Sequence, residues 1–303
     1  SMGKYYFSTE NINEVDYKGF DILLSHNNKI GDFNYGVNFI WSYVYGRWLK
    51  YAGDPENAPD YKKLTGKQIG TKLELIDEGL FQSQQEIEDS PTFSDRPPRP
   101  GYIKYKDLNG DGSITLAQDQ GYFGKSSIPT HTGSLELFGE WKGFDFDLLF
   151  SCGLGNSISL TGQTSLPGIA GSQIATSYTR PFNGLGNSPL YLVVNSWTPD
   201  NPNADFPRLE ITPNQGNNNN MASSYWNKNG NYLRLKTAQV GYNFPKNWFD
   251  YIGVEGLRVY IEGFNLFTWS KVSQFNIDPE FPSVNDGYYP QERKYAIGLR
   301  LTF

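Results

Sequence analysis

The sequence contains little cysteine, histidine or methionine, and it has no long apolar run. Of its 303 residues, one is Cys, two are His and two are Met. The single Cys152 permits no disulfide within the chain, and His26 and His131 lack the close spacing of metal ligands. Because no apolar run reaches about 18 residues, a transmembrane helix is excluded. The net charge of −6 argues against a nucleic-acid-binding surface.

Motifs of common catalytic sites are also missing. The chain has no G-x-S-x-G elbow, no phosphate-binding P-loop and no H-E-x-x-H zinc motif. Carboxylates are numerous, but no spacing selects a glycosidase pair, and Asp145 and Asp147 are better explained as polar positions of a strand. We therefore expect a protein that is not an enzyme.

Aromatic residues, glycine and proline are abundant. Phe, Trp and Tyr make up 16% of the chain, with 32 Gly and 18 Pro. Aromatic side chains favour strands, whereas Gly, Asn and Pro favour turns. This composition predicts an all-β chain with long loops.

Several segments alternate between two faces, as strands do. In 33–45 every second residue from Phe33 is Phe, Tyr, Val or Trp, and the closing segment repeats the pattern in Tyr295, Ile297, Leu299, Leu301 and Phe303. The expected strands are 17–25, 33–45, 132–141, 144–152, 231–244, 257–266 and 294–303.

Connection lengths decide between the two folds that such alternation permits, a soluble sandwich and a membrane barrel. Short connections are expected at 26–30, 142–143 and 245–256, and long ones at 46–131, 153–230 and 267–292. Outer-membrane barrels alternate in this way, with short periplasmic turns and long extracellular loops. We therefore predict an antiparallel transmembrane β-barrel segment of about seven strands.

A seven-stranded segment leaves two open edges, which lipid does not tolerate. The start, Ser1-Met2-Gly3-Lys4, is not followed by the apolar region of a signal peptide, although an outer-membrane protein must be exported. We expect the chain to be the C-terminal part of a longer protein that supplies the other strands.

Five stretches resemble the SusC (SusC/RagA) family of TonB-dependent outer-membrane transporters. They occur in the family's order and span nearly all of 1–303. They are Asn11–Leu24 with Lys18-Gly19-Phe20, Trp197–Pro207, Asn231–Pro245, Val259–Trp269, and Tyr289-Pro290 followed by Arg293–Phe303. The resemblance implies a barrel of about 22 strands with an N-terminal plug. It also implies a SusD-like lipoprotein lid as partner, and contact with TonB through the missing N-terminal part.

An acidic loop within 101–119 has the pattern of an EF-hand calcium loop. Asp107, Asn109 and Asp111 occupy positions 1, 3 and 5, Gly112 allows the sharp turn, and Ser113 would offer its carbonyl. Position 12 is Gln118 rather than a bidentate carboxylate, so Asp119 would have to supply the last ligand. The pattern fits either a structural Ca²⁺ site or an acidic turn held by Asx hydrogen bonds without metal.

Together these observations predict part of a nutrient transporter in the outer membrane of a Gram-negative bacterium, surrounded by the lipid bilayer. The imported ligand would be a glycan or an oligopeptide. The alternative is a secreted, calcium-stabilised, glycan-binding β-sandwich, which would be soluble without detergent.

Overall fold

The computed structural model describes residues 11–160, 163–165, 173–175, 190–209, 218–219, 221–249, 251, 253–275, 277–280 and 291–303. The chain forms two compact units. The sheet unit comprises residues 19–44, 127–178 and 227–303, and the loop unit comprises 1–18, 45–126 and 179–226. No helix within the described ranges is both long and apolar enough to cross a membrane.

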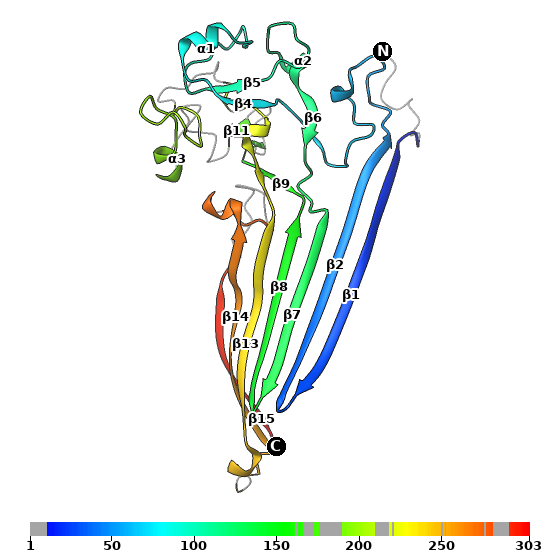
Figure 1. The fold of residues 1–303 in the computed structure, drawn as a ribbon, viewed down its shortest axis with the longest axis vertical. Coiled ribbons are helices and arrows are strands. Elements are labelled where there is room, and N and C mark those ends of the chain that lie inside the picture. Colours follow the sequence, from blue (N-terminus) through cyan, green and yellow to red (C-terminus); the bar gives the residue numbers. More distant parts are fainter. Residues whose placement is uncertain are drawn as a thin grey trace. The chain divides into compact units, whose positions relative to one another are not determined.

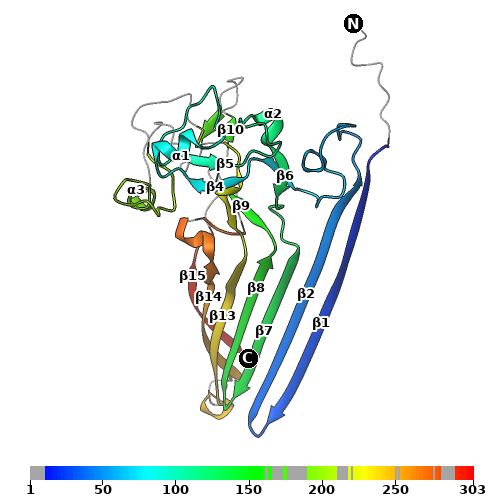
Figure 2. The same cartoon turned by 45° about the horizontal axis from the view of Figure 1, so that its top comes forward.

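One seven-stranded sheet dominates the sheet unit (Figures 1 and 2). Its strands in spatial order are β1 (Glu14–Ile30), β2 (Phe33–Lys50), β7 (His131–Trp141), β8 (Phe144–Leu154), β13 (Tyr232–Phe244), β14 (Gly256–Ser270) and β15 (Lys294–Thr302). The pairs from β2 to β15 are antiparallel, and every strand lies beside its nearest sheet neighbour in the chain. This order is that of an up-and-down barrel wall that is open at β1 and β15.

Two tight turns join neighbouring strands at one end of the sheet. Gly31, with φ 61°, opens the turn between β1 and β2. Lys142 and Gly143, with φ 48° and 89°, form the predicted two-residue turn between β7 and β8. Positive φ at both positions is the geometry of a type I′ hairpin, which matches the natural twist of paired strands.

The first strand is longer than the sequence predicts. We expected it to end at Ser25 and be followed by a connection at 26–30, but β1 continues to Ile30. The polar run His26–Lys29 resembles a turn in composition. In the structure it is an exposed part of the hairpin, where polar side chains remain in contact with solvent.

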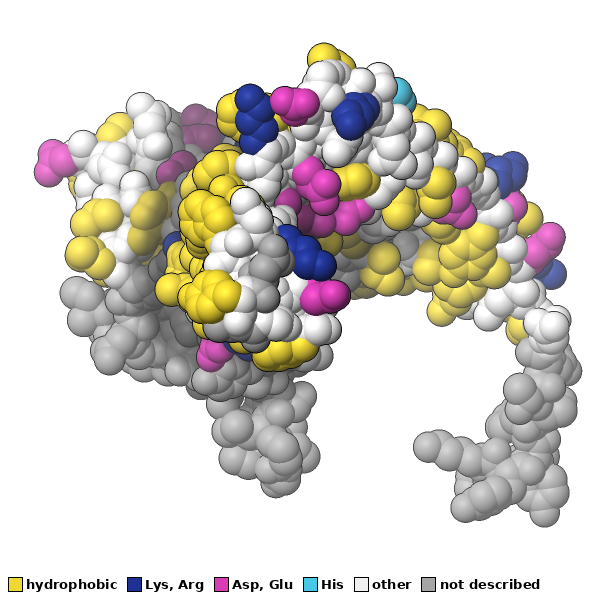
Figure 3. All heavy atoms as spheres, turned by 90° about the horizontal axis from the view of Figure 1, so that it is seen from below, with side chains coloured by type: hydrophobic (Ala, Val, Ile, Leu, Met, Phe, Trp, Pro, Cys, Tyr) yellow, Lys and Arg dark blue, Asp and Glu magenta, His cyan; other side chains and the backbone are white. Residues whose placement is uncertain are grey.

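The faces of the sheet differ in chemistry as predicted. Direct cross-strand partners share a face, so the register that pairs Val37 with Leu137, Leu137 with Leu148 and Leu148 with Ala238 defines an apolar face. Ile297 on this face is 80% exposed. Figure 3, which looks at the molecule from below, shows many hydrophobic side chains at the surface. The opposite, polar face carries Asn, Asp, Glu, Gln and Arg.

A sandwich core is not what these residues form. Within the described part of the sheet unit the only other sheets are two-stranded: β9 (Ser157–Ser159) with β12 (Asn227–Asn229), and β10 (Gln163–Ser165) with β11 (Gln173–Ala175). The large sheet is therefore a single layer, and the observed fold is a segment of a β-barrel.

The loop unit is built from short elements. Where the structure describes it, this unit contains two small sheets, β3 (Lys72–Glu74) with β6 (Gly121–Gly124), and β4 (Asp77–Leu80) with β5 (Ile103–Tyr105). Its helices are α1 (Gln84–Glu88), α2 (Leu116–Asp119) and α3 (Leu190–Val194), with 3-10 turns η2 (Asp60–Lys62) and η4 (Ser224–Trp226). The sheet unit adds η5 (Lys246–Trp248) and η7 (Lys271–Phe275).

Buried aromatic residues hold the loop unit together. Its fully buried side chains include Phe81, Tyr102, Phe206 and Trp226. Trp226 packs against Tyr225 with ring centroids 5.3 Å apart, and its indole N–H donates to the Asn219 carbonyl at 2.7 Å. These side chains come from segments far apart in the sequence, so the long connections form a folded body with its own core.

Candidate functional site

The polar face of the sheet contains a shallow trough of about 600 Å³. It crosses neighbouring strands because polar residues stand opposite one another in the register, as Asn38 does with Glu136 and Asp147 with Gln239. Its lining includes Asn38, Glu136, Asp147, Gln239, Arg258 and Arg300. The trough offers hydrogen-bonding and charged groups across the width of the sheet.

A network of charge-assisted hydrogen bonds ties three strands together within this trough. Arg258 on β14 forms a bidentate pair with Asp145 on β8, one bond being Nε to Oδ2 at 2.9 Å. Its Nη2 also donates to Gln239 Oε1 at 2.7 Å, and Gln239 donates to Glu262 at 2.9 Å. Such pairs combine geometric specificity with strength. The network therefore fixes β8, β13 and β14 relative to one another.

Gly241 makes this network possible. It lies on β13, directly between Asp145 on β8 and Tyr260 on β14. A Cβ atom at this position would lie 2.6 Å from Arg258 Nη2. The absent side chain is therefore what lets the guanidinium cross β13 to reach Asp145.

Replacing Gly241 by alanine should displace Arg258 and break its pair with Asp145. We expect a loss of about 1–3 kcal/mol, the usual effect of removing a hydrogen bond to a charged group. The unfolding temperature of the longer, detergent-purified protein measures it. Gly256→Ala is the matched control, because a Cβ there would come no closer than 3.8 Å to its neighbours. Equal unfolding temperatures for the two variants would show that Gly241 has no such role.

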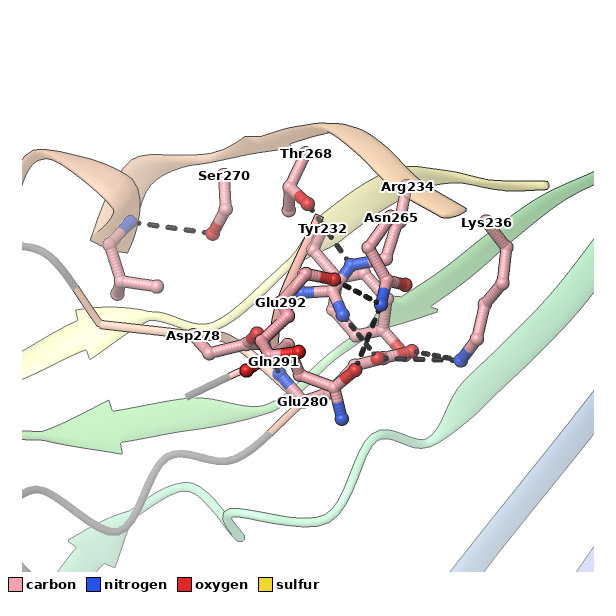
Figure 4. Close-up of polar contacts among 11 residues, drawn as sticks. Tyr232, Arg234, Lys236, Asn265, Thr268, Ser270, Asp278, Glu280, Gln291 and Glu292 are labelled. Atoms are coloured by element: carbon pink, nitrogen blue, oxygen red, sulfur yellow. Dashed lines mark hydrogen bonds and ion pairs between the residues drawn. The ribbon is translucent and has the colours of Figure 1, made fainter. Parts of the chain in front are cut away.

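A second polar cluster lies on the same face near the other end of β13, where the long connections begin (Figure 4). Its centre is Arg234, whose side chain is only 2% exposed. The guanidinium donates from Nε to Thr268 Oγ1 at 3.0 Å, from Nη1 to Glu280 Oε2 at 2.6 Å and from Nη2 to Asp278 Oδ1 at 2.6 Å. All three nitrogens are therefore engaged.

Glu280 is shared with neighbours of Arg234 on β13. Lys236 Nζ lies 3.1 Å from Glu280 Oε1, and the Tyr232 hydroxyl lies 3.2 Å from the same oxygen. Lys236 occupies a β-bulge, since the register shifts between Leu235 and Thr237. The bulge places Lys236 beside Arg234 in the cluster.

The C-terminal end of the connection between β14 and β15 is bound to the sheet by separate contacts. Asn265 on β14 has φ 52°, a conformation that Asn tolerates better than most residues. Its Nδ2 donates to Gln291 Oε1 at 3.0 Å and to the Glu292 carbonyl at 3.2 Å. Both ends of this connection are thus tied to the sheet (Figure 4).

The acidic loop of the loop unit is folded around its own backbone. Asp107 accepts hydrogen bonds from the N–H groups of Gly110 (2.7 Å) and Gly112 (2.8 Å). Asp111 accepts from the Ser113 N–H at 2.9 Å and from Asn109 Nδ2 at 2.7 Å. The N–H of Gly112 is the main cause that holds the pKa of Asp107 below its ordinary value.

Asp119 differs from the other predicted ligands because it is fully buried. Its Oδ1 accepts from the Leu108 N–H at 2.9 Å and its Oδ2 from the Thr115 N–H at 2.8 Å. Within the described ranges, no three His, Cys, Asp or Glu side chains are grouped as metal ligands. The loop thus satisfies its carboxylates by Asx hydrogen bonds, and a bound Ca²⁺ would have to share oxygens with these N–H donors. Calcium binding stays a prediction.

Comparisons with known proteins agree with this architecture. No protein-family model matches the sequence. TonB-dependent receptor P26 of Formosa agariphila is 29% identical over 97% of the chain, and TonB-dependent receptor P3 of the same organism is 27% identical over 97%. The chain is homologous to TonB-dependent receptors. It spans 28% of the length of receptor P26 and 29% of receptor P3.

Solved structures share the fold of this chain. A chain of the RagAB peptide transporter superposes with a TM-score of 0.66 at 22% identity, covering 99% of this chain and 31% of that one. RagAB in the "open-open" state gives a TM-score of 0.65 at 22% identity, covering 96% and 29%. The seven-stranded sheet and its long connections therefore have a counterpart in a larger chain.

Sequence reasoning located part of the polar face and missed its networks. It assigned Asp145 and Asp147 to the polar side of a strand, which the register confirms. It did not foresee the cluster around Arg234, because Asp278 and Glu280 lie more than forty positions further on. The one available signal was Arg234 itself, at a polar-face position of β13. Arg is rarely buried without a partner, but alternation alone does not show that this position is buried.

Proposed function

We propose that this chain forms the C-terminal wall of a TonB-dependent, SusC-type transporter in the outer membrane of a Gram-negative bacterium. The observation that carries the proposal is the contrast between faces: apolar side chains remain exposed on one face, and a charged trough lies on the other. Lipid on the first face and a polar lumen on the second would account for both. Homology to TonB-dependent receptors supports the same assignment.

This proposal sets the orientation of the sheet. The tight turns at Gly31 and Lys142–Gly143 would lie at the periplasm, and the long connections between β2 and β7 and between β8 and β13 would be extracellular. Extracellular loops are where a barrel of this kind meets ligand and partner.

The ligand we propose is an oligopeptide or a glycan, delivered beneath a SusD-like lipoprotein lid, with energy from TonB through parts of the longer protein. Similarity of fold to the RagAB peptide transporter makes oligopeptide the first class to test.

Deleting the gene of the longer protein tests this function. We expect slower growth on a defined oligopeptide mixture or a glycan panel as sole nutrient, restored by the gene on a plasmid, and unchanged growth on amino acids and monosaccharides. The protein should also be recovered from outer-membrane fractions and migrate differently in gels before and after heating. Unaltered growth on every oligomer together with recovery from the soluble fraction would refute the proposal.

We also propose the acidic loop as a structural Ca²⁺ site, as its EF-hand-like order of ligands suggests. In that case Ca²⁺ should slow proteolysis within residues 101–119, and replacing Asp107 and Asp111 together by alanine should abolish the effect. Asp60→Ala, at a fully exposed carboxylate, is the control. Equal cleavage of the unmutated protein in Ca²⁺ and in chelator would remove the metal and leave the hydrogen-bonded turn.

The same loop should respond to acid in the presence of chelator. The folded-state pKa of Asp107 is lowered, so its contribution to stability is present above the unfolded-state pKa and is lost as the pH falls through the folded value. Proteolysis of 101–119 should therefore accelerate in acid in the unmutated protein. The Asp107→Ala variant should be cleaved quickly at every pH.

A further inference from the structure

We propose that residues 271–275 and 277–280 form a fixed strap across the polar face of β13 and that Arg234 is the positioning residue that holds it there. We give the strap the role of permanently narrowing the lumen along the polar face of the sheet, at the end of β13 where the long connections begin. This role rests on the proposed transport function. The contacts that fix the strap do not depend on that function.

The strap presents two carboxylates together to a single guanidinium. Asp278 Oδ1 accepts the Glu280 N–H at 2.9 Å as well as the Arg234 bond, so an Asx turn aligns both acids. Arg234 and Lys236 supply two positive charges against two negative ones. The charges of the cluster are therefore balanced, and each nitrogen of Arg234 already donates to an acceptor of the protein.

Apolar burial holds the other part of the strap. Val272 is fully buried, and Phe275 and Ile277 are 4% and 8% exposed. The turn into η7 is closed by the Val272 N–H, which donates to Ser270 Oγ at 3.3 Å. Lifting the strap would expose these three side chains and leave buried charges unpaired, so we infer a fixed element rather than a moving gate.

A lysine could not replace Arg234. The guanidinium reaches three acceptors on two segments in one plane, whereas an ammonium is a point charge without that fork. The strap therefore depends on the shape of Arg234 as well as on its charge. This dependence distinguishes positioning from simple charge compensation.

The experiment uses whole cells that carry the longer protein in an intact outer membrane. All variants are made in the Cys152→Ala background. Val272→Cys reports on the strap, since cysteine is a small apolar residue that tolerates burial. Neighbouring Ser273, which is exposed, provides the matched reporter Ser273→Cys. The probe is a membrane-impermeant maleimide added from outside the cell.

We expect Ser273→Cys to be labelled readily in every background and Val272→Cys to be protected while Arg234 is present. Arg234→Gln and Arg234→Lys should both raise the labelling rate at Val272→Cys by about tenfold or more, because labelling follows the population of the open form. Lys246→Gln, which removes an exposed pair with Glu255 at the opposite end of β13, should leave it unchanged. Protection that survives Arg234→Gln, or full rescue by lysine, would overturn the proposal.

If Arg234→Gln fails to assemble, the triple variant Arg234→Gln, Asp278→Asn, Glu280→Gln removes the charges together and decides the same question. Uptake of a fluorescent pool of tryptic casein peptides provides the functional readout. The concentration for half-maximal uptake should shift while the maximal rate per assembled barrel is retained. If the parent takes up no peptide, the peptide proposal fails, but the labelling result still decides the role of Arg234.

Discussion

Replacing Trp226 by alanine should destabilise the loop unit by about 3–5 kcal/mol, the usual cost of removing a buried aromatic side chain. The indole is fully buried, lies 6.4 Å from the ring of Phe206 and donates a hydrogen bond to the Asn219 carbonyl. Its removal leaves a cavity in the centre of a small core and deletes this hydrogen bond. Such a loss is a large fraction of the free energy of unfolding of a typical domain.

The sheet unit should remain folded in this variant, because it is a separate compact unit whose strands pair with one another. Pulse proteolysis of the longer protein in detergent measures the effect. We expect faster cleavage within residues 45–126, while the seven-stranded sheet stays protected. Trp248→Ala is the control, since that side chain is 57% exposed. If both tryptophan variants resist protease equally, the loop unit has no cooperative core of its own.

Replacing Leu299 by arginine should cost about 2–4 kcal/mol if the side chain lies near the middle of a bilayer. Leu299 is on the apolar face of β15, opposite Val259, and is 68% exposed in the chain. A charge there would have to enter lipid. Reversible unfolding of the longer protein from phospholipid vesicles measures the difference.

Ala296→Arg is the control that shows whether the loss depends on the face that carries the arginine or on the size of the new side chain in β15. Ala296 stands opposite Glu262 on the polar face, so arginine there would meet water and an acid. We expect it to fold almost as well as the parent. If Leu299→Arg is tolerated as well as Ala296→Arg, the apolar face does not contact lipid.

Local pattern was enough to predict the sheet. Alternation located all seven strands, because one face of the sheet carries apolar side chains, the other carries polar ones, and each strand alternates between them. It failed at the end of β1, where His26–Lys29 are polar on both sides of an exposed hairpin. Where both faces of a strand meet water, the residues carry no periodic signal.

The long connections could not be predicted in the same way. Tyr105 donates its hydroxyl hydrogen to the Asn218 carbonyl at 2.7 Å, and the Trp197 indole donates to Gln82 at 3.0 Å. These contacts join residues about a hundred positions apart, with no repeating pattern between them. The cluster around Arg234 could not be predicted for the same reason. Its partners Asp278 and Glu280 approach it only because the connection between β14 and β15 folds back onto the sheet.

The interleaving of the two units has an evolutionary consequence. Each long connection leaves one strand and returns to that strand's immediate neighbour, β2 to β7 and β8 to β13. The register between those neighbours is fixed by their own pairing, so a connection can lengthen, shorten or be exchanged without shifting the wall. Under the transport function proposed above, a lineage would change its ligand by altering residues 45–126 and 179–226 while the strands change slowly. Among relatives, we expect insertions and deletions to concentrate in those two stretches.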